Sequence, residues 1–254
     1  MNAFQNVVSR EMETPNPKFQ ITSSKMLQNT VWRKLVVQWY FDVIDRYEFD
    51  RDVGYAAISI FDRFLDIPKS AKRASDKIFY ETSATASLIL ALRLFTNDLP
   101  FAEELLEMTK SCISTIDVRN ACIEIYGSVD WENLPPAPTQ FAKEMIELLP
   151  SSVSEPLKNH LLQSVLYNLE LSVQDELCMS LPPSLLTWMA LENVLDITDC
   201  CSYDDKCNLR CTIISMTGHS ESLTLRRRLQ RLHNEDKHPD IIPVRIAHAI
   251  LIDQ

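Results

Sequence analysis

The feature that most constrains this sequence is a run of apolar residues with helical spacing over residues 32–65. Its first half predicts one face of a helix, and a polar joint at residues 48–52 leads into a second. The two faces hold Leu35, Val36, Trp39, Tyr40, Val43, Ile44 and Tyr47, then Val53, Ala56, Ala57, Ile60, Phe61, Phe64 and Leu65. Two helices this apolar have to cross each other and be covered by further helices.

Glycine is scarce, with Gly54, Gly127 and Gly218 the only three in 254 residues. Phosphate-binding loops, Rossmann turns and tight hairpins need closely spaced glycines, so nucleotide-binding enzymes of those kinds are excluded. Helical spacing recurs throughout, and strand alternation is rare. We therefore predict an all-α fold, whose 46% hydrophobic residues can fill one large core or two smaller ones.

Charge and cysteine usage limit the partners and the compartment. The formal net charge of −10 disfavours direct nucleic-acid binding, which needs a basic surface. Seven scattered cysteines without a secretory leader favour reduced thiols and a location in the nucleus, the cytoplasm or both. No apolar run comes close to the roughly 20 residues of a membrane helix, so we predict no membrane partner.

Further helices follow along the first half. Residues 66–77 are polar and contain Pro68, which predicts a loop. Residues 78–95 are apolar nearly all round, as in a helix surrounded by neighbours. A short helix is expected at residues 101–108, and Ser114 with Asp117 predicts the N-terminal cap of the next one. The expected inner face of that helix is Ile116, Ala121, Cys122, Ile125, Tyr126 and Val129.

Prolines at 135, 136 and 138 predict a linker between two domains. We expect a flexible lead-in over residues 1–28, a first domain over 29–134 and a second over 138–254. In the second domain, helical spacing resumes at residue 141, and its last helices are expected near residues 204–217, 220–234 and 243–252.

One set of residues has a characteristic order: Arg33, Trp39, the tetrad Asp62, Arg63, Phe64 and Leu65, and then Trp131, Pro136 and Phe141. This order and spacing resemble the cyclin box. A weaker resemblance to the second cyclin repeat rests on Glu170, Leu171, Ser172, Asp175, Pro183 and Ser184. The resemblance implies two cyclin-like helical bundles in tandem, a five-helix box followed by a more divergent repeat.

The cyclin resemblance also implies a function. Such a chain is a regulatory subunit that binds and activates a cyclin-dependent protein kinase, and it is not an enzyme and uses no cofactor. The family presents a lysine on the third helix and a glutamate on the fifth to the kinase. The matching positions are Arg93 and Cys122, so the cation is kept and the acid is missing. Glu124 is near in sequence but points about 200° away around the helix.

The resemblance implies two further sites on the first helix. Many cyclins dock kinase substrates or inhibitors that carry short basic-hydrophobic motifs, and the matching residues are Trp32, Leu35, Val36, Trp39 and Asp42, with Glu81 as a weaker match. An equally open interpretation makes these ordinary core residues. Arg33 and Asp62 match a buried ion pair that joins the first two helices and has a structural role.

Other interpretations remain open at this stage. A cyclin-fold adaptor or transcription-related scaffold that does not activate a kinase is the alternative, favoured by Cys122 in place of an acid. A zinc site at Cys200, Cys201, Cys207 and Cys211 is disfavoured because paired C-x-x-C spacing is absent, so no metal is predicted. The basic cluster at Arg226, Arg227, Arg228 and Arg231 is expected to be a solvated helix face or a contact for an acidic partner.

Overall fold

The fold is known from a computed structural model, which describes residues 3–14, 26–96, 105, 113–175, 178, 181–198 and 200–235. Within these residues the regular structure is entirely helical, which confirms the predicted all-α class. The chain divides into two compact units. The N-terminal unit consists of Ser9–Ala137 with Gln174–Leu181, and the C-terminal unit consists of Met1–Val8, Pro138–Val173 and Pro182–Gln254.

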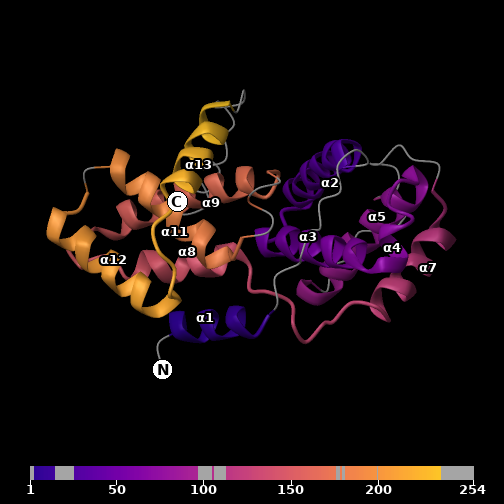
Figure 1. Cartoon of the computed structure of the whole chain (residues 1–254), viewed down its shortest axis with the longest axis horizontal. Helices are drawn as coiled ribbons and strands as arrows, with labels where there is room; N and C mark the ends of the chain where they lie inside the picture. Colours follow the sequence, from indigo (N-terminus) through magenta and orange to yellow (C-terminus); the bar gives the residue numbers. More distant parts are fainter. Residues whose placement is uncertain are drawn as a thin grey trace. The chain divides into compact units, whose positions relative to one another are not determined.

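The described helices of the N-terminal unit form one bundle (Figure 1). They are α2 (Met26–Tyr47), α3 (Arg51–Asp66), the single turn α4 (Pro68–Ala71), α5 (Lys77–Phe95) and α7 (Thr115–Tyr126). Helix α5 lies at the centre, with α3, α7 and α2 packed against it. The helix predicted at residues 78–95 is therefore confirmed, whereas the one expected at residues 101–108 lies outside the described residues.

Helix α5 is buried over most of its length and still contains several hydroxyl groups. Because a buried hydroxyl needs a partner, each of these donates a hydrogen bond to the carbonyl four residues earlier; they belong to Thr82, Ser83, Thr85 and Ser87. The expectation that no segment is long and apolar enough for a membrane span is wrong, because α5 meets that test by length and composition. With 72% of its apolar window buried inside the protein, α5 serves as a core helix.

The crossing of α2 and α3 depends on a glycine. A Cβ atom on Gly54 would lie 2.7 Å from Ile44 Cδ1 and 2.9 Å from Phe41 Cε1, so any other residue here would force these side chains to shift. The buried side of α2 differs from the predicted one, because Val37 and Phe41 are buried while Leu35 is 59% exposed. Leu35 lies on the opposite side of α2 from these buried residues.

Two local predictions for the N-terminal unit have different outcomes. The cap of α7 is confirmed, since Ser114 Oγ accepts a hydrogen bond from Asp117 N and Ser114 N donates one to the Asp117 carboxylate. The expected loop at residues 66–77 is wrong in part, because Pro68 begins the short helix α4. Proline is tolerated in a first turn, where its missing N–H has no helical partner to lose.

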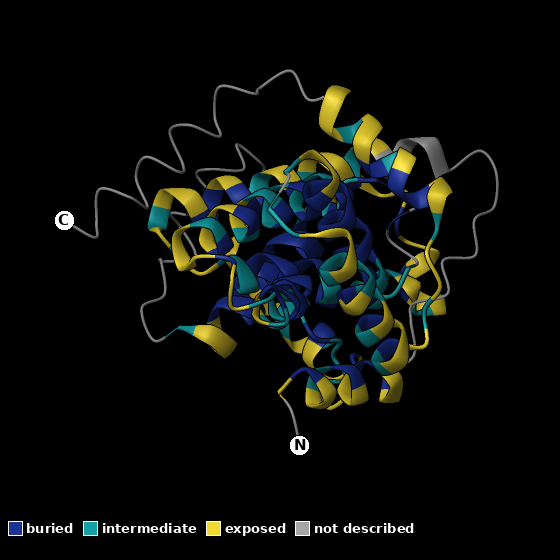
Figure 2. Cartoon of the chain, turned by 90° about the vertical axis from the view of Figure 1, so that its left-hand side faces the viewer, coloured by how far each residue is buried: buried dark blue, intermediate teal, exposed yellow. Residues whose placement is uncertain are grey.

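The C-terminal unit is a second helical bundle. Its helices are α8 (Pro138–Glu147), α9 (Glu155–Ser172), α11 (Pro183–Ile197), α12 (Tyr203–Thr217) and α13 (Leu223–Glu235). Helix α11 is its centre and packs against α8, α9 and α13. Figure 2 shows the buried residues gathered on the inner sides of the helices. The helices expected near 204–217 and 220–234 correspond to α12 and α13, and the one near 243–252 lies outside the described residues.

The ends of the predicted domains need correction. Residues 3–13 form helix α1 (Ala3–Glu13) in place of a flexible lead-in. Phe4 and Val8, four residues apart, give this helix a buried apolar side, and Phe4 meets Phe141 edge to face with ring centroids 6.4 Å apart. The contacts of Gln174–Leu181 are with the N-terminal unit, so the two units are not continuous in sequence.

The predicted role of the arginine cluster on α13 also needs correction. Arg226 is buried, and its guanidinium pairs with Asp196 and, at 2.6 Å, with Glu221. Its neighbour Arg227 is exposed. Glu192 of α11 is 3% exposed and accepts hydrogen bonds of 3.0 and 2.9 Å from Arg210 Nε. Part of the expected cationic face is therefore an internal ionic network that joins α11, α12 and α13.

Candidate functional site

The outward side of α7 carries a stripe of large apolar side chains. Ile116, Ile123 and Tyr126 are 69%, 65% and 68% exposed. They are spaced by seven and three residues and share one side of the helix. The predicted inner face is therefore wrong for Ile116 and Tyr126, because the buried side of α7 contains Val118 and Ile125. We call Ile116, Ile123 and Tyr126 the α7 stripe.

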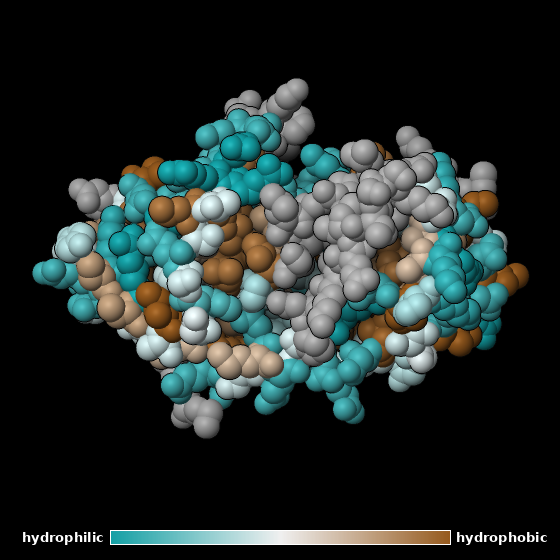
Figure 3. All heavy atoms as spheres, in the orientation of Figure 1, coloured by the Kyte–Doolittle hydropathy of each residue, from teal (hydrophilic) through white to brown (hydrophobic). Residues whose placement is uncertain are grey.

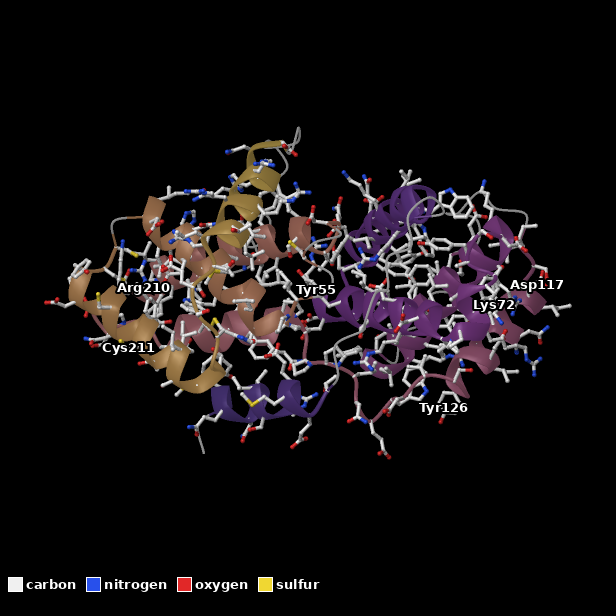
Figure 4. The ribbon with its side chains drawn as sticks, viewed as in Figure 1. Tyr55, Lys72, Asp117, Tyr126, Arg210 and Cys211 are labelled. Atoms are coloured by element: carbon white, nitrogen blue, oxygen red, sulfur yellow. The ribbon has the colours of Figure 1, made fainter. Side chains whose placement is uncertain are left out.

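Further apolar surface adjoins the α7 stripe. The rings of Tyr126 and Trp131 lie 5.6 Å apart, and Trp131 Nε1 donates a hydrogen bond of 2.8 Å to the Tyr126 carbonyl. At the end of α5, Leu94 and Phe95 are exposed. Figure 3 shows apolar surface at the end of the view where α5 and α7 lie, and Figure 4 shows Tyr126 on the outer side of α7.

Arg93 and Cys122, the two residues predicted to face a kinase, lie close enough to interact. Arg93 is exposed in the last turn of α5. Cys122 is half-buried at the edge of the α7 stripe, and its Sγ lies 3.8 Å from the carbonyl oxygen of Ala86. Burial raises the pKa of the Cys122 thiol, while the positive charge of Arg93 acts to lower it. The thiol therefore stays protonated at neutral pH.

Glu124 does not replace the missing acid. Its carboxylate lies 3.1 Å from Lys69 Nζ and 3.3 Å from the guanidinium of Arg73. Burial alone would raise the pKa of Glu124, but these two cations outweigh it and the pKa is lowered. The other acid of α7, Asp117, is engaged in the helix cap. Within α7, all of which the structure describes, no carboxylate lies on the stripe.

A pocket of about 340 Å³ lies between α2 and α5. Helix α2 lines it with Trp32, Leu35, Val36 and Trp39, and α5 lines it with Lys77, Tyr80, Glu81, Ala84 and Thr85. Four of the five residues predicted for substrate docking are thus brought together, with Glu81 facing them. Asp42, the fifth, is exposed and is not among the residues that line the pocket.

The pocket is mainly aromatic, with polar groups at particular points. Trp32 meets Tyr80 in an edge-to-face contact, with ring centroids 5.4 Å apart. Glu81 forms an ion pair of 3.5 Å with Lys77, one turn earlier on α5. The Trp39 Nε1 is buried, and within the described part of the chain it has no hydrogen-bond partner. A ligand carbonyl is the kind of group that would satisfy this donor.

The wall of the pocket is supported by the ion pair of Arg33 and Asp62. Arg33 donates from Nε to Asp62 Oδ1 at 2.9 Å and from its terminal nitrogen to Oδ2 at 2.7 Å. Burial alone would lower the pKa of Arg33, but Asp62 outweighs it and the pKa is raised. The pair fixes α2 against α3, and thereby sets the position of the pocket residues of α2.

The cysteines predicted to be reduced are not assembled into a metal centre in the described residues. The thiols of Cys200 and Cys201 lie 3.6 Å apart, Cys207 is half-buried, and Cys211 is exposed. Among the residues described, no group of three or more His, Cys, Asp or Glu side chains is arranged to hold a metal ion.

Sequence reasoning missed Ile123 of the α7 stripe and the exposed Arg119 beside it. It also missed four residues of the pocket, Lys77, Tyr80, Ala84 and Thr85. A signal for Ile123 was present. Helix α7 carries apolar residues on two sides at once, and a short helix in a bundle buries only one of them. The pocket residues of α5 gave no such signal because that helix is apolar all round.

The geometry so far defines an all-helical protein with tandem bundles and two surfaces suited to protein contacts. A family model for the cyclin N-terminal domain matches residues 2–133, more than half of the chain. The chain belongs to the cyclin family. The crystal structure of a viral cyclin from herpesvirus saimiri is similar in fold, with a TM-score of 0.69 and 17% sequence identity over 92% of this chain and 97% of that one. Cyclins are regulatory proteins, not enzymes.

Proposed function

We propose that this cyclin binds and activates a cyclin-dependent protein kinase through the α7 stripe and Arg93. The observation that carries the proposal is the exposure of Ile116, Ile123 and Tyr126 on one side of α7, beside a cation of α5. Large apolar side chains gathered on a surface mark protein contacts. The cyclin resemblance expects the kinase at this position.

The proposed mechanism uses no reacting groups. A kinase that is about 1% active alone becomes about 99% active when its partner favours the active arrangement by about 5.5 kcal/mol. Burying three large apolar side chains contributes on the order of 1.5–3 kcal/mol each. The α7 stripe is therefore large enough to shift this equilibrium, provided that the inactive arrangement cannot make the same contacts.

The test is binding of the purified chain to a panel of cyclin-dependent kinases, followed by a phosphotransfer assay of each complex. We expect at least one kinase to bind and to gain activity. Ile123→Asp places a charge in the apolar contact and should abolish both effects, while leaving the fold intact because the side chain is 65% exposed. Failure of every kinase to bind would refute the proposal.

We propose in addition that the pocket between α2 and α5 docks substrates or inhibitors with short basic-hydrophobic motifs. Its aromatic walls suit apolar side chains, Glu81 suits a basic one, and Trp39 Nε1 suits a main-chain carbonyl. Leu35→Asp should abolish capture of a fluorescent peptide with such a motif. Capture that persists in this variant would contradict docking at the pocket.

The second candidate function is a cyclin-fold adaptor that does not activate a kinase. Two observations favour it, the neutral Cys122 and the engagement of Glu124 by Lys69 and Arg73. The kinase panel separates the two candidates. An adaptor would bind without raising phosphotransfer, and its binding would survive Arg93→Glu, whereas binding by the proposed activator depends on that arginine.

A further inference from the structure

Two arginines lie beside the α7 stripe in a chain whose overall charge is strongly negative. Arg119 is exposed, and its position three residues after Ile116 and four before Ile123 places it within the stripe. Arg93 borders the same surface near Cys122. Among the described residues of α5 and α7, therefore, this surface combines apolar side chains with two cations, against a net charge of −10 for the whole chain.

Both carboxylates of α7 are engaged by other groups. Asp117 accepts hydrogen bonds from the backbone and hydroxyl groups of Ser114, and Glu124 pairs with Lys69 and Arg73. Both acids lie about 110–140° around α7 from the centre of the stripe. Within α7, therefore, no carboxylate lies on the stripe beside Arg93 and Arg119.

We infer that the partner's contact surface is apolar and acidic, with carboxylates opposite Arg93 and Arg119 and no cation opposite Cys122. This inference rests on the proposed function and specifies which kinases qualify. Complementary charges favour the correct partner, and like charges across an interface exclude the wrong one. Arg119 becomes a residue that determines partner choice, and the half-buried thiol of Cys122 offers no charge to hold a partner's lysine or arginine.

The first test reverses the charge within the stripe. With the kinase that binds best, Arg119→Glu should weaken the affinity about tenfold, since it repels the proposed carboxylates. Arg227→Glu is the matched control, because Arg227 is an exposed arginine on α13, and it should change the affinity less than about twofold. Raising the salt concentration should weaken binding of the natural chain more than that of Arg119→Glu. An unchanged or tighter affinity of Arg119→Glu overturns the inference.

The second test places an acid at residue 122. Cys122→Gln and Cys122→Glu have side chains of the same size, so the difference between them isolates the charge. We expect Cys122→Glu to bind the kinase about tenfold more weakly than Cys122→Gln. Tighter binding of Cys122→Glu would show a cation on the partner, and would overturn the inference while leaving kinase binding itself established.

A third measurement needs no kinase and keeps the two proposals separable. Two synthetic amphipathic helical peptides share a leucine face, and carry either glutamates or lysines beside it. The glutamate peptide should bind the full chain, and Ile123→Asp should abolish its binding. If no kinase binds but the glutamate peptide binds and Ile123→Asp abolishes that binding, the proposed function fails. The inference that the α7 stripe binds an apolar, acidic surface then still stands. No binding of the glutamate peptide, or binding that survives Ile123→Asp, overturns the inference.

Discussion

The Asp62 carboxylate accepts two hydrogen bonds from the Arg33 guanidinium, and each side chain is only 9% exposed. A buried charge that loses its partner is destabilising by about 3–5 kcal/mol. We therefore expect Asp62→Ala to lower the free energy of unfolding by about that amount, as measured by denaturant titration. The double variant Arg33→Met with Asp62→Leu removes both charges, so it should lower the free energy of unfolding by less than Asp62→Ala does. A double variant that costs as much as the single one would contradict this account.

Gly54 and Gly127 provide a matched pair for testing close packing. At Gly54 a methyl group meets Ile44 and Phe41, and the ring of Phe41 is itself held against Tyr55 with centroids 5.7 Å apart. Overpacking typically costs about 1–3 kcal/mol, and the helix-propensity gain offsets about 1 kcal/mol of it, so we expect Gly54→Ala to destabilise the protein by up to about 2 kcal/mol.

Gly127 is the control for that substitution. Its φ of −81° is accessible to alanine, and the nearest atom to an added Cβ is the carbonyl oxygen of Ile123 at 3.5 Å. Gly127→Ala should therefore be neutral or stabilise by up to about 1 kcal/mol. If α2 and α3 cross closely at Gly54, thermal unfolding should show a lower melting temperature for Gly54→Ala and an unchanged or higher one for Gly127→Ala.

The sequence predicted the fold because the helices that build it have strong local signals. The apolar length of α5 and the cap of Ser114 with Asp117 each identify a helix without knowledge of its neighbours. The start of α4 was missed because Pro68 is compatible with either a loop or a first turn. Helix α1 was missed because Phe4 and Val8 make only a short apolar side.

The candidate sites were less predictable, because exposure is decided by which neighbours a helix meets. The four α2 residues at the pocket were found from their match to the cyclin pattern. Ile116 and Tyr126 were assigned to the core because spacing identifies an apolar side of a helix and not what covers it. The role of Arg226 was missed for a related reason, since its partner Asp196 lies on α11, 30 residues earlier in the sequence.

The thiol of Cys122 reports on the position of Arg93. Because the thiolate is the reactive form, a thiol whose pKa is raised by burial should be alkylated slowly at pH 8. Arg93→Ala removes the charge that lowers this pKa, so the pKa rises further and alkylation by iodoacetamide slows. Mass spectrometry resolves the rate at each cysteine, with exposed Cys211 as a reference that should not change. A faster rate at Cys122 would contradict the proximity.

The same pKa shift has a consequence for stability at high pH. A folded-state pKa above the unfolded value means that the folded protein holds the Cys122 proton more tightly. The stabilisation is complete below the unfolded pKa and is lost as the pH rises through the folded one. Cys122→Ala should accordingly reduce the loss of stability above the ordinary thiol pKa, as followed by thermal unfolding across that range.

Adjacent arginines of α13 test the ionic network of the C-terminal unit. Arg226 pairs with Asp196 and Glu221, and its Nε donates a hydrogen bond of 3.1 Å to the side-chain oxygen of Asn193. Because these groups lose a partly buried partner, Arg226→Gln should destabilise the protein by about 2–4 kcal/mol. Its neighbour Arg227 is exposed, so Arg227→Gln should stay within about 0.5 kcal/mol. Equal effects in denaturant titrations would rule out a network centred on Arg226.

The α7 stripe and the pocket between α2 and α5 should act independently in binding. Leu35 and Ile123 are both exposed apolar residues on helices of the N-terminal unit, and each lies in one surface only. Leu35→Asp should abolish capture of a basic-hydrophobic peptide and leave kinase affinity within about twofold, whereas Ile123→Asp should do the reverse. Effects of substitutions at separate sites add when the sites do not share partners, so the double variant should lose both activities. If either single substitution abolishes both, the two surfaces belong to one contact, and the assignment of separate roles is wrong.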